Sequence, residues 1–147
     1  MSKSRLYLDN CCFNRPFDNQ EQWKVYLETQ AKLAIQEQVL LGRCELIWSY
    51  ILEYENAQHP VAEVRHEIAL WRDYATVVIE ASDSVIAQAQ EMMRQGIHLK
   101  DALHVACAVS AQADCFVTTD RKLLNKLATI DRLKAMNPIV FIEEYEL

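Results

Sequence analysis

Residues 96–124 read GIHLKDALHVACAVSAQADCFVTTDRKLL, and this stretch decides the fold. It begins with a helix pattern that is apolar on almost every face, from Ala102 to Val109, and continues through a turn into a short apolar run, residues 115–117. A helix with so little polar surface is expected to be buried, and the run has the length and composition of a buried strand. The stretch therefore predicts a helix that leads into a strand of the core.

Two acids stand at the ends of these predicted elements. Asp101 lies in the first turn of the helix, although acids are seldom buried without a partner. Asp120 follows the strand, where the chain passes into the next helix. Ligands of open α/β sheets bind beyond the carboxyl ends of the strands. We therefore expect Asp120 to lie at a functional edge of a sheet, with Asp101 near it.

Composition indicates one folded domain that spans residues 1–147. Hydrophobic residues make up 51% of the chain, and its 2 glycines and 3 prolines leave little room for long loops. The net charge of −6 argues against a broad basic surface for nucleic acid. It does not exclude a nucleic-acid enzyme, because metal ions bound by clustered acids reverse the local charge.

Cysteine usage and hydropathy indicate the compartment. The 5 cysteines are an odd number and form no C-x-x-C pair, which is typical of reduced thiols in a cytosolic protein. No signal-peptide pattern and no run of about 18 apolar residues occurs. We therefore expect a cytoplasmic protein that is not associated with a membrane.

Strand and helix patterns alternate along the chain. We predict strands at 5–8, 44–48, 76–81, 115–117 and 139–142. We predict helices at 20–41, from 50 onward, and at 60–74, 83–95, 101–110 and 121–129, with a loop containing a turn of helix at 10–19. This alternation indicates the α/β class, with a parallel sheet of four to five strands flanked by helices on both faces.

Further acids follow the first and second strands. Asp9 ends the first strand, and the helix after the second strand offers Glu53 and Glu55. At helical spacing Glu55 stacks on the apolar residues Ile51 and Leu52, so it is the candidate for the inward face. Glu53 stacks on the other side and is the candidate for the solvent face. A shift of the helix frame by one turn would undo this assignment of Glu55 to the inward face and Glu53 to the solvent face.

Several carboxylates in one pocket raise each other's pKa unless cations offset their charge. Oxygen ligands without His or Cys suit Mg²⁺ or Mn²⁺. Each acid also has a structural interpretation. Asp101 would complement the helix dipole, Asp120 would cap the next helix, and Asp9 would be a loop acid.

The acids stand in a pattern that resembles the PIN domain, including the VapC-like toxins of toxin–antitoxin pairs. The matching parts are Leu8-Asp9, Ser49 followed six residues later by Glu55, the run KDALHVA at 100–106, and TTD at 118–120. The resemblance implies a PIN-like fold and a metal-dependent endoribonuclease site. Its acids would be Asp9, Glu55, Asp101 and Asp120, which would serve as both catalytic residues and metal ligands, with Thr119 and Asn10 in support.

Two departures from the family pattern stand out. Asn10 occupies the place where many members have Thr or Ser, and the helix at 20–41 is long. The resemblance implies one or two Mg²⁺ or Mn²⁺ ions that orient the scissile phosphate of RNA and activate water. It also implies an antitoxin partner, a homodimer, and products with a 5′-phosphate and a 3′-hydroxyl. Lys100, Arg121 and Lys122 either meet RNA phosphates or form a solvated face.

His104 lies three residues after Asp101, and we expect a buried, hydrogen-bonded histidine there rather than a metal ligand. Trp23, Trp48 and Trp71 are expected to serve core or interface packing. Two rival functions remain. The first is a catalytically inactive PIN-fold domain that binds RNA or a protein partner. The second is a receiver or haloacid-type phosphatase, which requires an acid pair or D-x-D that the first strand lacks.

Overall fold

The computed structural model describes residues 3–145. Its strands are β1 (Ser4–Leu8), β2 (Cys44–Ser49), β3 (Val77–Ile79), β4 (Cys115–Val117) and β5 (Ala135–Met136). Its α-helices are α1 (Asn10–Asn14), α2 (Trp23–Leu40), α3 (Tyr50–Ala57), α4 (Ala62–Ala69), α5 (Asp83–Arg94), α6 (Leu99–Ser110), α7 (Arg121–Leu127) and α8 (Pro138–Tyr145). Two 3₁₀ helices, η1 (Arg15–Phe17) and η2 (Leu70–Tyr74), extend α1 and α4.

The strands form one parallel sheet in the order β3-β2-β1-β4-β5. β1 is the central strand, where Tyr7 is in register with Ile47 of β2 and with Phe116 of β4. All three residues are fully buried, as expected of strands that helices cover on both faces. Because the strands are parallel, β1 and β4 end at the same edge of the sheet.

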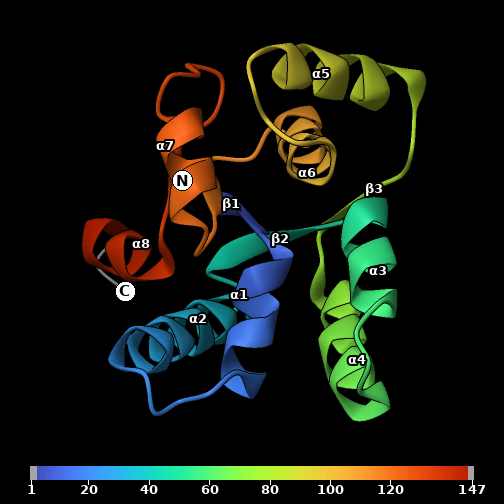
Figure 1. Ribbon diagram of the computed structural model, residues 1–147. Helices are drawn as coiled ribbons and strands as arrows, with labels where there is room; N and C mark the ends of the chain where they lie inside the picture. Colours follow the sequence, from blue (N-terminus) through green and yellow to red (C-terminus); the bar gives the residue numbers. More distant parts are fainter. Residues whose placement is uncertain (1–2, 146–147) are drawn as a thin grey trace.

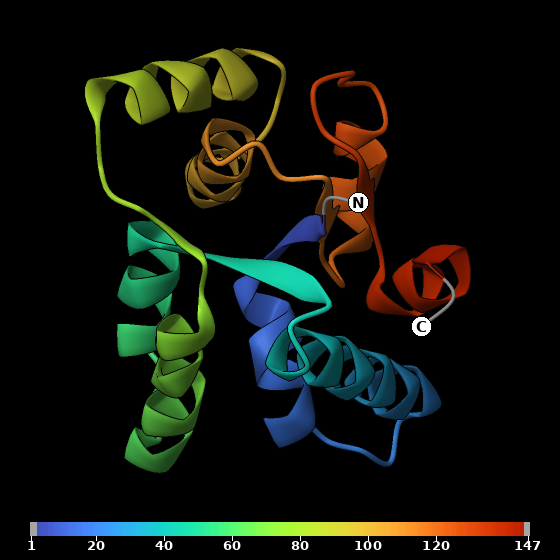
Figure 2. The same ribbon diagram turned by 180° about the vertical axis from the view of Figure 1, so that it is seen from behind.

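Helices cover both faces of the sheet (Figures 1 and 2). α5 and α6 pack together on one face, and α1 and α2 lie on the other. α8 packs against α2, and α3 with α4 lies beside the β3 edge. The α/β class and the parallel sheet predicted from the sequence are thus confirmed. None of the helices in the described part of the chain is long and apolar enough to span a bilayer.

The C-terminal strand predicted at 139–142 is wrong, because these residues lie in α8 and the last strand is β5. A short apolar run does not distinguish a strand from a buried helix. Local signals favour the helix: Pro138 occupies its first position, and the Asn137 side chain accepts a hydrogen bond from the Ile139 backbone N–H at 2.8 Å. Phe141 is fully buried and stacks on Tyr145 one turn later, with ring centroids 4.3 Å apart.

Other boundaries differ by a few residues. The helix predicted at 60–74 divides into α4 and η2, and the strand predicted at 76–81 is shorter. Trp48 is buried and meets the Phe13 ring edge-on, with centroids 5.6 Å apart. Trp71 is partly buried, whereas Trp23 is 78% exposed at the start of α2. Trp48 therefore belongs to the core, and Trp23 does not.

Candidate active site

Asp9 is a buried acid whose carboxylate the protein itself satisfies. It follows β1 in an extended conformation and caps α1, so its side chain accepts the Asn10 backbone N–H at 2.8 Å. The other oxygen accepts the Thr118 hydroxyl at 2.8 Å and the Cys11 thiol at 3.5 Å. The residue is only 6% exposed. Hydrogen bonds from β4 and α1 thus hold this carboxylate at the end of β1.

Asp120 lies at the same edge of the sheet. The Asp9 backbone N–H donates to Val117 O at 2.9 Å, which ties the ends of β1 and β4 together. Asp120 caps α7 by accepting the Leu123 N–H at 3.1 Å, and its own N–H donates to the Thr118 hydroxyl at 3.1 Å. Asp120 is exposed. Asp120 therefore has the predicted capping role. It is also hydrogen-bonded to Thr118, the residue that donates to Asp9.

Glu55 reaches the same region from α3. Ser49 caps this helix by accepting the Leu52 N–H at 3.2 Å, which sets the helix frame. In that frame one carboxylate oxygen of Glu55 makes a short hydrogen bond with His104 Nε2, and the other accepts from the Asn10 side-chain amide at 3.4 Å. Asn10 thus contacts Glu55, and its supporting role stays a prediction.

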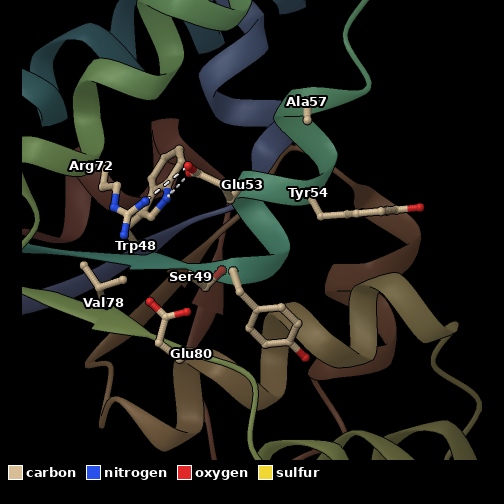
Figure 3. A pocket seen from close by; sticks show the side chains of 9 residues that line it. Trp48, Ser49, Glu53, Tyr54, Ala57, Arg72, Val78 and Glu80 are labelled. Atoms are coloured by element: carbon tan, nitrogen blue, oxygen red, sulfur yellow. Dashed lines mark hydrogen bonds and ion pairs between the residues drawn. The ribbon is translucent and has the colours of Figure 1, made fainter.

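Glu53 lies on the opposite flank of α3. Its carboxylate accepts the Trp48 indole N–H at 2.8 Å and pairs with the Arg72 guanidinium at 3.3 Å, as Figure 3 shows. These contacts hold Glu53 in a pocket away from Asp9. Of the two acids in this helix, Glu55 is therefore the one that joins the candidate site.

His104 connects Glu55 to the core. It is fully buried, as expected, and its Nδ1 is 2.6 Å from the Tyr7 hydroxyl, which is 2.7 Å from the Ser49 hydroxyl. Its Nε2 meets Glu55 and lies 3.8 Å from an Asp9 oxygen. Histidine in this position is thus hydrogen-bonded on both ring nitrogens, and it also holds a site acid.

The His104–Glu55 contact shifts both pKa values. Burial alone would lower the pKa of His104, but the hydrogen bond to Glu55 and the charge of Asp9 raise it overall. Burial alone would raise the pKa of Glu55, but His104 and Lys100 lower it overall. Both shifts favour the charged pair, in which Glu55 is ionised and His104 is protonated.

Asp101 differs from the other acids because no hydrogen bond or ion pair satisfies its carboxylate within residues 3–145. It lies half-buried in the first turn of α6. Burial raises its pKa, the negative charges of Asp9 and Asp120 raise it further, His104 opposes the shift, and Glu55 adds a smaller increase. The other three predicted acids are therefore close enough to Asp101 for their charges to affect it. The charge of His104 offsets this repulsion only in part, so the pKa of Asp101 stays raised.

The chemistry of these donors fits a hard divalent cation. Carboxylate oxygens are the ligands that Mg²⁺ and Mn²⁺ prefer, and repulsion among the acids provides a reason for a cation to bind. Yet no three His, Cys, Asp or Glu side chains within residues 3–145 are arranged to hold a metal as they stand. The carboxylate oxygens of Asp9 and Glu55 accept hydrogen bonds from protein groups. The structure therefore shows residues that could bind a metal, but it does not show a completed metal site.

The remaining site candidates lie around the acids. Thr119 is buried, and only its backbone contacts the cluster, through an N–H that meets the Cys11 sulfur at 3.4 Å. The hydroxyl that reaches Asp9 belongs to Thr118, which sequence reasoning did not single out, although side-chain alternation along an extended strand could have indicated it. Lys100, Arg121 and Lys122 are exposed, and Arg121 borders a cleft of about 340 Å³ next to Thr119.

A second pocket, of about 430 Å³, lies on the Glu53 flank of α3. Figure 3 shows Val78 and Glu80 from the β3 edge facing Glu53 and Arg72 across it. It contains none of the four predicted acids. This pocket and the cluster of predicted acids are therefore separate features of the molecule.

Comparison with solved structures shows the same fold in two chains. One is from the crystal structure of VapBC2 from Rickettsia felis bound to a DNA fragment from their promoter, with a TM-score of 0.58 and 14% identity over 90% of this chain and 98% of that one. The other is from VapBC-1 of nontypeable Haemophilus influenzae, with a TM-score of 0.57 and 17% identity over 91% and 98%.

Sequence comparison identifies the family. No curated protein matches the chain significantly. The family model described as the PIN domain, however, matches residues 6–129, which include the four predicted acids. This match spans most of the chain and agrees with the fold likeness. The chain therefore belongs to the PIN domain family.

Proposed function

We propose that this protein is a Mg²⁺- or Mn²⁺-dependent endoribonuclease that hydrolyses RNA phosphodiester bonds at Asp9, Glu55, Asp101 and Asp120. Membership of the PIN family, a family of nucleases, supports the reaction class. The single observation that carries the site is the joining of the ends of β1 and β4 by the Asp9 N–H to Val117 O bond, which brings Asp9 and Asp120 to one edge of the sheet. Asp101 is near enough that, after burial, their charges raise its pKa. Repulsion of this kind is what a bound divalent cation would relieve.

The metal would be held by Asp101 together with Asp9 and Asp120, with Glu55 at the side. When bound, a divalent cation polarises a phosphodiester and lowers the pKa of water. The residues of this chain position the reaction. Glu55, ionised and held by His104, accepts a proton from the attacking water. Thr118 and the Asn10 backbone hold Asp9 in place.

Basic residues at the rim would bring the RNA to the acids. Lys100, Arg121 and Lys122 are exposed near Asp101 and Asp120, and Lys100 is close enough to Glu55 to lower its pKa. Their positive charges would attract the phosphates of the backbone without reading its sequence. The proposal therefore predicts cleavage that weakens as salt concentration rises.

The proposal includes a partner and a setting. Both solved structures described above come from VapBC assemblies, and we extend this to a toxin of a toxin–antitoxin pair that binds an antitoxin protein. A homodimer and a cytoplasmic location complete the proposal. Co-expression with a small DNA-binding protein encoded beside this chain, followed by size-exclusion chromatography with light scattering, tests the partner and the dimer together.

A second candidate function is a PIN-fold domain without catalysis that binds RNA or a protein partner. The observation that favours it is the engagement of the acids: Asp9 and Glu55 are satisfied by protein donors, Asp120 caps a helix, and no triad within the described residues is arranged to hold a metal. Under this alternative, RNA would bind without being cut.

Cleavage of labelled RNA by wild type and by Asp101→Asn, with Mn²⁺, with Mg²⁺ and with chelator, separates the two functions. We expect cleavage by wild type only with metal, and a loss of about 100-fold or more in Asp101→Asn. Asp73→Asn, an exposed acid of η2, is the matched control and should cleave as wild type does. Binding without cleavage under all conditions would support the non-catalytic alternative, and unchanged cleavage in chelator would refute the metal site.

A further inference from the structure

A cleft of about 340 Å³ lies beside the acid cluster, between α2, α7 and α8. Thr119 and Asn137 line it, and these residues follow the carboxyl ends of β4 and β5. Arg121 lines it too, so Asp120 is flanked along the chain by two residues of the cleft. Ligands of open α/β sheets bind beyond the carboxyl ends of the strands. The cleft is therefore placed where a ligand would reach Asp120.

Two cations of this cleft have no acid as a partner. Lys24 at the start of α2 and Arg121 at the start of α7 line the cleft, and both residues are exposed. Within residues 3–145, neither charged group forms an ion pair with a carboxylate. Positive charges from two different helices thus border one cleft, which favours a ligand with negative charge.

The one acid that lines the cleft is already engaged by other groups. Glu28 of α2 is fully buried, and its carboxylate accepts hydrogen bonds from Arg15 Nε at 3.0 Å and from the Asn137 side-chain amide. A buried carboxylate that is paired and hydrogen-bonded in this way is compensated. Glu28 therefore leaves the charges of Lys24 and Arg121 available to a ligand, and it also fixes Asn137 in the wall of the cleft.

The remaining side of the cleft is apolar apart from one hydroxyl. Leu124, Ile139 and Val140 form this side, which we call the aliphatic wall, and Val140 is 42% exposed. Thr119 is 5% exposed, and its hydroxyl makes no hydrogen bond within the described residues. Ligand pockets usually span roughly 300–1,000 Å³ and combine apolar walls with a few polar groups. The cleft has this composition, and its size suits one small ligand.

Together these features fit a nucleotide. Its phosphate supplies the negative charge that Lys24 and Arg121 attract, and its base supplies a flat face that packs on the aliphatic wall. A base inside a duplex is stacked on both sides, so only a base that has left its stack can enter the cleft. Because Asp120 lies beside the cleft, a nucleotide held there would be next to a phosphodiester at the acids.

We propose that the cleft holds one unstacked nucleotide of RNA, adjacent to the bond that is cut. Lys24 and Arg121 bind its phosphate, its base packs on the aliphatic wall, and the Thr119 hydroxyl hydrogen-bonds to its sugar. This role rests on the proposed ribonuclease function, and it makes the base held in the cleft a determinant of where RNA is cut. It also gives Lys24, which was not among the predicted site residues, a direct contact with the substrate.

A single abasic nucleotide in a labelled single-stranded RNA, placed beside the mapped cut, tests the proposal. With Mn²⁺, removing the base on one side of the cut should lower kcat/KM of wild type about tenfold, because its packing on the aliphatic wall is lost. Val140→Trp fills the cleft, so the same change should cost this variant less than about twofold. Val61→Trp, at a similarly exposed valine before α4, is the matched control and should lose as much as wild type. Wild type that cleaves RNA but ignores abasic nucleotides on both sides of the cut, or an equal loss in Val140→Trp, would overturn the proposal.

Binding of adenosine 5′-monophosphate in chelator, followed by NMR of the methyl groups of the aliphatic wall, needs neither metal nor cleavage. We expect saturable shifts with the nucleotide, smaller shifts with inorganic phosphate, and an affinity for the nucleotide about tenfold lower in Lys24→Met. Lys3→Met, at an exposed lysine before β1 on the opposite edge of the sheet, is the matched control and should bind as wild type does.

The binding measurement separates failure of the cleft from failure of the nuclease. Nucleotide binding that Lys24→Met weakens, in a protein that cuts no RNA, would refute the proposed ribonuclease and support the cleft as a nucleotide site. Absent shifts, or equal affinity in Lys24→Met and wild type, would overturn the cleft assignment even if RNA is cut. Shifts of equal size with inorganic phosphate would reduce the cleft to an anion site and overturn the nucleotide.

Discussion

Asp9 and Asp101 are acids of the same cluster, but they differ in burial and in the hydrogen bonds that their carboxylates accept. Asp9 is almost fully buried and receives donors from Asn10, Cys11 and Thr118. Asp101 is less buried, has no such donor within the described chain, and its pKa is raised. The difference shows that the fold supplies hydrogen-bond donors to the carboxylate at the end of β1 and none, within the described residues, to the carboxylate at the start of α6.

The largest expected loss of stability comes from replacing His104, which connects Tyr7 of the core to Glu55 of the acid cluster. His104→Leu would leave Glu55 and the Tyr7 hydroxyl without their partner, and losing one member of a buried charged pair costs about 3–5 kcal/mol. Urea unfolding should show this loss of stability. Glu53→Gln, on the outer flank of α3, is the control and should cost no more than about 1 kcal/mol. Equal losses in the two variants would show that the His104 network has no special role.

Thr118→Val tests the support of Asp9. Losing a hydrogen bond to a charged carboxylate costs about 1.5–3 kcal/mol of the free energy of unfolding. The neighbouring Thr119→Val removes a hydroxyl that makes no hydrogen bond within the described residues, so it should cost less. Chemical denaturation of both variants makes the comparison, and a larger loss in Thr119→Val would contradict the assigned contact.

The pH dependence of stability should be smaller than these effects and should reflect the His104–Glu55 pair. His104 has a raised pKa, so its contribution is complete below its ordinary value of 6.5 and is lost as pH rises through the folded value. Glu55 has a lowered pKa, so its contribution is present above 4.5 and is lost as pH falls. Metal-free protein should thus be most stable between these values. The same titration of His104→Leu should lack this maximum.

Asp101→Asn should have the smallest effect on stability. Removing a charge that its neighbours repel should leave the unfolding free energy unchanged or raise it by up to about 1 kcal/mol in metal-free buffer. The exposed Asp131→Asn, in the loop after α7, is the reference. A marked loss of stability in Asp101→Asn would mean that a protein donor satisfies this acid after all.

The sequence predicted the centre of the fold better than its C-terminal part. α6 and β4 were predicted because their residues are apolar almost without interruption, and Glu55 was preferred to Glu53 because it stacks on apolar residues. The run 139–142 is equally apolar but lies in a helix, because the Asn137 cap and Pro138 outweigh the strand propensity of the run. Local composition alone did not distinguish these cases.

Two features of the molecule were not predicted from the sequence. Thr118 and Thr119 are adjacent and chemically alike, and only the direction of each side chain at the end of β4 decides which one meets Asp9. Lys32 stands among polar residues of α2, where lysine is normally exposed, and tertiary contacts bury it. Both features depend on packing between elements that are distant in the sequence.

The pKa of Asp101, followed by NMR of its side-chain carboxyl carbon, tests the central claim most directly. In metal-free buffer we expect a value above 3.8, and in saturating Mg²⁺ we expect this value to fall. A pKa of Asp101 that is ordinary without metal, or that does not respond to Mg²⁺ or Mn²⁺, would contradict the account of a cation-binding acid cluster.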